Sequence, residues 1–126
     1  MAYSPYGRIL FQQKSDLAGA AATSSAAIDI HDSTDLWLAA FVVGTPTGTG
    51  ETLNVQLDVF DAFGNVFSNV LALTQITTST KSAQGSLGVH VNGTGSLVLP
   101  SSCQVTWTLG GTNPKFPGTC ITLIGR

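Results

Sequence analysis

Residues 53–59 read LNVQLDV, in which every second side chain is apolar and the positions between them carry Asn, Gln and Asp. Successive side chains of a β-strand point to opposite faces, so this alternation predicts a strand with one buried and one solvent-facing side. Residues 103–109, CQVTWTL, repeat the same period of two and place Trp107 on the apolar side. The sequence therefore predicts an all-β protein with Trp107 in its core.

A third segment, residues 35–43 (DLWLAAFVV), also reads as a strand but is apolar on both faces. Leu36 and Leu38 would share one face, and Trp37 and Phe41 the other. Such a strand is either central in its sheet or covered on its outer face by another surface. Weaker strand patterns occupy residues 26–30, 66–74, 86–91, 96–99 and 119–124.

Turn residues separate these segments. Asn92-Gly93 predicts a tight hairpin turn, and residues 44–50 and 110–114 are rich in Gly, Thr and Pro, which predicts loops. Seven or eight short strands with turn signals about every 8–12 residues are typical of an antiparallel β-sandwich. Residues 1–23 show no alternation, and the Ala-rich segment 15–22 is too short to predict a helix. We therefore expect an N-terminal arm over 1–23 and a sandwich domain over 24–126.

Composition narrows the possible partners. Only 10% of the 126 residues are charged, against about 25% in an average soluble domain, while 43% are apolar and the net charge is -2. These values exclude a disordered chain. The basic residues are scattered singly, which argues against a nucleic-acid partner, and no apolar run is long enough to span a membrane. The scattered residues are Arg8, Lys14, Lys81, Lys115 and Arg126.

Candidate catalytic and metal-binding groups are few. His31 lies among three carboxylates in residues 29–35, a pattern that could bind a divalent cation but that fits a polar turn better. His90 reads as a solvated strand residue, and no Gly-x-Ser-x-Gly elbow marks a nucleophile. The first residues lack the pattern of a secretory signal, so Cys103 and Cys120 are expected to be reduced thiols. We predict no enzymatic activity, no metal and no cofactor.

The scarcity of charge also bears on assembly. Soluble proteins protect exposed sheet edges with lysines or prolines, yet none of the three lysines falls inside a predicted strand. Interfaces are depleted in charge at their core and enriched in aromatic residues. We therefore expect a homo-oligomer or an assembly subunit, with a monomer kept soluble by its Ser and Thr residues as the alternative.

The C-terminal half carries a resemblance to a known class of proteins. Residues 105–114 (VTWTLGGTNP) are its most specific part, together with 70–77 (VLALTQIT), 97–100 (LVLP) and 121–126 (ITLIGR). With these motifs the chain resembles, over residues 28–126, small β-rich virion proteins of tailed bacteriophages. Cys103, Cys120 and the break at residues 116–118 depart from that pattern.

The resemblance implies a jelly-roll-like sandwich in the virion, most simply a head decoration or cement protein that binds the major capsid protein and copies of itself. The residues expected to contact these partners are mostly apolar or aromatic: Tyr3, Tyr6, Arg8, Ile9, Phe11, Trp37 and Phe41. One alternative is a glycan-binding module of a phage fibre, whose site would lie in loops 44–51 and 110–117 with Trp37 or Phe116 as stacking platform. A tail or connector subunit is the other.

Overall fold

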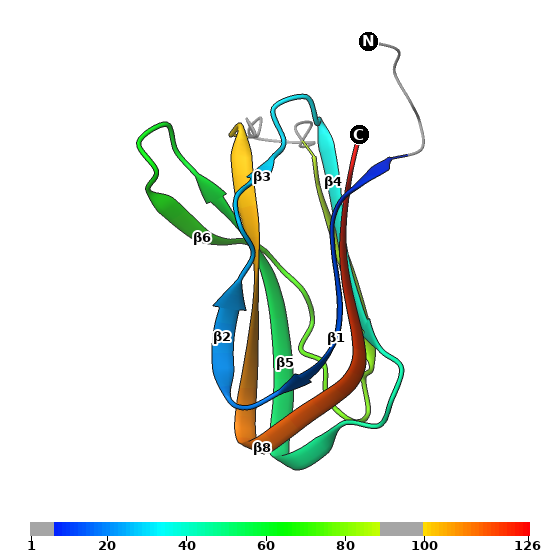
Figure 1. Cartoon of the computed structure of the whole chain (residues 1–126). Helices are drawn as coiled ribbons and strands as arrows, with labels where there is room; N and C mark the ends of the chain where they lie inside the picture. Colours follow the sequence, from blue (N-terminus) through cyan, green and yellow to red (C-terminus); the bar gives the residue numbers. More distant parts are fainter. Residues whose placement is uncertain (1–6, 89–99) are drawn as a thin grey trace.

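The computed structural model describes residues 7–88 and 100–126, and within them the protein is built from antiparallel β-strands (Figure 1). The strands are β1 (Arg8–Ala18), β2 (Ala21–Ser24), β3 (Ile28–Asp29), β4 (Asp35–Val42), β5 (Thr47–Phe60), β6 (Val66–Ala72), β7 (Ser82–Gly88) and β8 (Ser102–Gly125). The predicted all-β class is confirmed. The expected hairpin at Asn92-Gly93, the strand over 96–99 and His90 lie outside the described residues. No helix able to cross a membrane occurs in this part of the chain.

Strand β8 organises the fold because it belongs to both layers of the sandwich. Its first half pairs with β5 on one edge and with β2 and β3 on the other, and β6 extends this layer beyond β5. Its second half pairs with β4 and β1, and β7 extends that layer beyond β4. Figure 1 shows β8 running down one layer, bending, and returning along the other.

The bend lies where the sequence predicts a loop. Residues 110–117 stay within β8, but Gly111 (φ 99°) and Asn113 (φ 49°) adopt left-handed conformations, as does Gly118 (φ 67°) just beyond. Left-handed residues inside a strand produce bulges that bend it without ending its pairing. The Gly and Pro residues of this segment therefore correctly indicated irregular backbone, but the prediction that the strand ends there was wrong.

The core lies between the two layers. The alternation read from residues 53–59 and 103–109 is confirmed, since their apolar side chains are all buried. From β4, Leu36, Leu38, Ala40 and Val42 face them. Trp107 is 6% exposed, as predicted, and the ring of Phe11 stacks on it with centroids 6.0 Å apart.

The N-terminal segment lies within the sandwich over most of its length. Residues 8–18 and 21–24, expected to form part of an arm outside it, instead form β1 and β2 and pair with β8. Phe11 pairs in register with the buried Leu123 and packs against the core, so it is partly buried rather than free on an arm. The sequence shows no alternation here because two of the side chains that β1 turns inward, Gln13 and Ser15, are polar.

Candidate functional site

The outer face of β4 is the most unusual surface of the molecule. Strand β4 is central in its layer, with β7 on one side and β8 on the other. Its alternate residues Trp37, Ala39 and Phe41 point away from the core, and the Trp37 and Phe41 residues are 38% and 46% exposed. Of the two arrangements that the doubly apolar sequence suggested, the structure shows the first: β4 is central, and no other element of residues 7–88 and 100–126 covers its outer face.

Neighbouring strands add mainly small polar side chains beside these aromatic rings. In register with Trp37, Ala39 and Phe41, strand β7 places Ser86, Gln84 and Ser82, and β8 places Ile124, Thr122 and Cys120. Strand β1 continues all three rows, with Ile9 beside Ile124, Gln12 beside Thr122 and Lys14 beside Cys120. We call the surface formed by these residues of β7, β4, β8 and β1 the aromatic face.

Two hydrogen bonds hold polar groups of the aromatic face in place. The indole Nε1 of Trp37 donates to Oε1 of Gln84 over 2.8 Å, which holds the N–H edge of the ring toward β7. On the other side, Nε2 of Gln12 donates to Oγ1 of Thr122 over 3.4 Å. The Gln84 amide accepts through its oxygen, so its NH2 group can still donate to a ligand. The face thus presents fixed aromatic surface next to amide and hydroxyl groups.

Charge is confined to the two ends of the aromatic face. At one end, Nε of Arg126 lies 3.1 Å from Oδ2 of Asp35. At the other end, Lys14 of β1 lies in the row of Phe41, beside Cys120, and Asp16 follows it along the strand. The side chains between these ends, all within the described strands, are uncharged. A ligand that lies on the middle of the face therefore meets a neutral surface.

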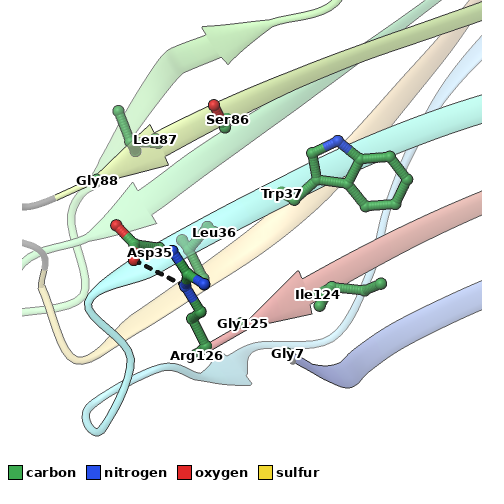
Figure 2. Close-up of a pocket in the computed structure, with 10 residues that line it drawn as sticks. All are labelled: Gly7, Asp35, Leu36, Trp37, Ser86, Leu87, Gly88, Ile124, Gly125 and Arg126. Atoms are coloured by element: carbon green, nitrogen blue, oxygen red, sulfur yellow. Dashed lines mark hydrogen bonds and ion pairs between the residues drawn. The ribbon is translucent and has the colours of Figure 1, made fainter. Parts of the chain in front are cut away.

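Three shallow hollows of about 350 to 450 Å³ follow one another along β4. The first lies beside Trp37 and the Asp35–Arg126 ion pair, the second lies over Ala39 between Trp37 and Phe41, and the third lies beyond Phe41. Figure 2 shows the first, with the Trp37 indole on one side and the ion pair on the other. Their size falls in the range of small-molecule sites.

The other residues predicted to contact partners are dispersed. Ile9 is 61% exposed and lies at the edge of the aromatic face, through its pairing with Ile124. Arg8 instead pairs with Asp32, with Nη2 and Oδ1 2.7 Å apart. Tyr3 and Tyr6 lie outside the described residues. The structure therefore brings together Trp37, Phe41 and Ile9 from the predicted set.

The prediction that loops 44–51 and 110–117 form a glycan-binding site is wrong. Phe116 is fully buried and cannot act as a stacking platform. Residues 47–52 begin β5 and pair with residues 110–115 of β8, so the two segments pair with each other rather than form an open site. Trp37, the other platform considered, lies on the aromatic face and remains available.

The His31 region is a polar turn, as the sequence favoured. The backbone N–H of His31 donates to Oδ1 of Asp29 over 3.0 Å, and its Nδ1 lies 2.7 Å from the same oxygen. This hydrogen bond to the Asp29 carboxylate raises the pKa of His31, and the reciprocal bonds lower the pKa of Asp29. Among residues 7–88 and 100–126, no three His, Cys, Asp or Glu side chains are grouped to hold a metal ion.

The cysteines are both buried and unpaired by a disulfide. Cys103 lies in the core, and burial, with a smaller effect of the Asp58 charge, raises its pKa to about 12. Such a thiol is not nucleophilic at neutral pH. Cys120 lies on the aromatic face but is only 7% exposed.

Asp58 is a buried carboxylate, 2% exposed, that the sequence reading treated as solvent-facing. Its Oδ1 accepts hydrogen bonds from the backbone N–H of Asn69 and from Nε2 of Gln56, and its Oδ2 accepts them from Nε2 of Gln104 and Oγ1 of Thr106. Burial by itself raises the pKa of Asp58, but these hydrogen bonds outweigh it and lower the pKa. Through these hydrogen bonds the carboxylate, which belongs to β5, links β6 and β8.

A second group of exposed apolar side chains lies on the hairpin that joins β5 to β6. Phe63 at its tip is 91% exposed, and Val66 and Phe67 on β6 are 48% and 55% exposed. Figure 1 shows this hairpin projecting from the body of the sandwich. None of these residues was among those expected to contact a partner.

Comparisons with known proteins give little further guidance. No family model and no curated protein matches the chain. Among solved structures, the chain is similar to the CBM22-1 xylan-binding domain from Paenibacillus barcinonensis Xyn10C. The two share 12% sequence identity with a TM-score of 0.47, over 98% of this chain and 99% of that domain. Values this low do not support a transfer of function from that domain.

Proposed function

We propose that the protein is a non-catalytic binding module for neutral carbohydrate, with the aromatic face as its site. The observation that carries the proposal is the pair of exposed rings, Trp37 and Phe41, on the outer face of a central strand. The C–H face of a sugar ring is apolar and can stack on an aromatic ring, which carries partial negative charge on its face. The hydroxyl groups around the sugar need donors and acceptors, which Gln84, Gln12 and Thr122 supply.

A peptide ligand fits this surface less well. An extended peptide binds best at a sheet edge, where its backbone N–H and C=O groups find open partners. On β4 the backbone already pairs with β7 and β8 over most of its length, so it offers a peptide none of these groups. A sugar has no such requirement, because side chains and water can satisfy its hydroxyl groups.

The neutral middle of the face favours an uncharged ligand over a polyanion. Strong binding to phosphate or sulfate chains requires several basic side chains along the path of the ligand. Here Lys14 lies at one end of the path, in the row of Phe41, and Arg126 at the other end is paired with Asp35. We therefore expect weak or no binding to nucleic acid and to sulfated glycans.

Affinity electrophoresis against immobilised neutral polysaccharides, followed by calorimetry on any ligand found, tests the proposal. Trp37→Ala is expected to weaken binding about tenfold, since one lost aromatic contact costs roughly 1 kcal/mol beyond its area. Phe63→Ala is the matched control, because it removes an exposed ring from the β5–β6 hairpin instead. Equal affinities for the wild type and Trp37→Ala would remove the aromatic face as the site.

A second candidate is a subunit of a protein assembly, such as the virion component that the sequence resemblance implies. The β5–β6 hairpin favours it, since Phe63, Val66 and Phe67 are large apolar side chains exposed on it. Interfaces are enriched in aromatic residues. In this case we expect the purified chain to self-associate in light scattering, and Phe63→Asp with Phe67→Asp to abolish it. A chain that stays monomeric at high concentration would exclude this candidate for the isolated protein.

A further inference from the structure

The aromatic face has a repeating structure along β4. Its three hollows alternate with the two exposed rings: hollow, Trp37, hollow over Ala39, Phe41, hollow. The repeat follows from the strand itself, because residues two apart share a face and the middle one of the three is small. Ala39 leaves space between the rings that a larger side chain would fill.

The distance between the two rings decides which ligands can use both. Trp37 and Phe41 are four residues apart on one strand, which at about 3.3 Å per residue places them roughly 13 Å apart. A single sugar ring is shorter than this distance. A ligand that stacks on both rings must therefore contain at least one more sugar between them, over Ala39.

The polar groups of the face match this arrangement. Gln84 lies opposite Ala39 on β7, and Thr122 lies opposite Ala39 on β8. The Gln84 amide lines the middle hollow, and the Thr122 hydroxyl lies on the other side of Ala39, so both can meet the hydroxyl groups of a sugar held between two stacked neighbours. The aromatic contacts lie at the outer positions and the polar contacts at the central one.

We propose that the aromatic face binds a linear, neutral oligosaccharide of at least three sugars, aligned with β4, with outer sugars on Trp37 and Phe41 and a middle sugar over Ala39. The inference rests on the proposed carbohydrate function and specifies its ligand. Monosaccharides would use only one ring, and a branch at the middle sugar would meet the side chains of β7 and β8. The site therefore selects for chain length and for an unbranched chain.

Calorimetry with a series of unbranched β-linked oligosaccharides of glucose, xylose and mannose, from one to six sugars, tests the proposal. For the series that binds, we expect affinity to rise at least tenfold from one sugar to three and then to level off, because further sugars extend beyond the rings. Phe41→Leu keeps apolar bulk but removes the ring, so it is expected to lower trisaccharide affinity about fivefold to tenfold.

Ala39→Glu is the second variant, because it fills the middle hollow and leaves both rings in place. It is expected to abolish the gain from one sugar to three. Circular dichroism and thermal unfolding of each variant confirm folding, and Phe67→Leu is the matched control for a ring lost elsewhere. A monosaccharide that binds as tightly as the trisaccharide, or a Phe41→Leu variant with unchanged trisaccharide affinity, would overturn the three-sugar site and leave the carbohydrate function standing. No binding to any member of any series would overturn both.

Discussion

Replacing Asp58 by alanine should cause a large loss of stability, even though the residue was expected on the polar side of its strand. The carboxylate is 2% exposed and accepts four hydrogen bonds, from Gln56, Asn69, Gln104 and Thr106. A hydrogen bond to a charged group contributes about 1.5–3 kcal/mol. In the variant, the three side-chain donors can turn toward water because they are half-buried. Hydrogen bonds to water then replace part of the free energy that each lost bond contributed.

The backbone N–H of Asn69 regains less hydrogen bonding than the side-chain donors do, because a backbone group cannot rotate toward water as a side chain can. Asn69 has a φ of 65°, and its N–H donates to Oδ1 of Asp58 across the irregular part of the β5–β6 pairing. Leaving such a donor without a partner costs about 1–3 kcal/mol. Adding a few tenths to 1 kcal/mol for the side-chain donors, we expect Asp58→Ala to lower the free energy of unfolding by about 2–4 kcal/mol.

Urea unfolding monitored by circular dichroism measures this free energy. Asp29→Ala is the matched control, because its carboxylate is 72% exposed and its loss should change the free energy by no more than about 0.5 kcal/mol. If Asp58→Ala unfolds within about 0.5 kcal/mol of the wild type, the hydrogen bonds around the carboxylate do not stabilise the fold and the reasoning fails.

The same group makes stability depend on pH. The pKa of Asp58 is lowered from its ordinary value of 3.8, so the folded state binds the proton more weakly than the unfolded state. The stabilisation is then fully present above about pH 4 and is lost as the pH falls through the folded pKa. Asp58→Asn removes this contribution, so its stability should fall less steeply below about pH 4 than that of the wild type.

Three further predictions follow from the strands and their turns. Cys103, with a pKa of about 12, should react with a disulfide reagent at pH 8 only after denaturant is added, in a variant that keeps no other thiol. The pKa of His31 should lie above 6.5 when measured by NMR, and Asp29→Asn should lower it. Any stability that the His31–Asp29 pair contributes is present below pH 6.5 and is lost as the pH rises through the folded pKa. Gly111→Ala should destabilise by about 2 kcal/mol or more in thermal unfolding, because φ is 99° and the added Cβ would lie 2.6 Å from a carbonyl oxygen of β5.

The sequence predicted the strands in which apolar and polar residues alternate regularly. It missed those in which polar residues point inward or left-handed residues bend the strand. Residues 53–59 and 103–109 could be read directly, because one face of each is buried and the period of two is intact. Strand β1 could not, because Gln13 and Ser15 lie on its inner side, and the middle of β8 could not, because left-handed residues bend it without ending the pairing. Burial also depends on distant partners, which is why Phe11 and Phe116 resemble exposed aromatic residues in the sequence and are packed in the structure.

Only part of the candidate site could be predicted from the sequence. The doubly apolar pattern of residues 35–43 marked Trp37 and Phe41 as unusual, but a strand with two apolar faces can be covered by another layer or left open. Gln84, Gln12 and Thr122 carry no signal of their own, since they come from three strands far apart in the chain.

The sequence by itself therefore determined the all-β class and the apolar side of each regular strand, because side-chain direction along a strand is a local property of the backbone. The tertiary structure decided that β4 lies between β7 and β8 with its outer face open, and that a single bent strand connects the two layers. These features depend on pairing between residues distant in the chain, and pairing of that kind is fixed by the packing of the whole sandwich.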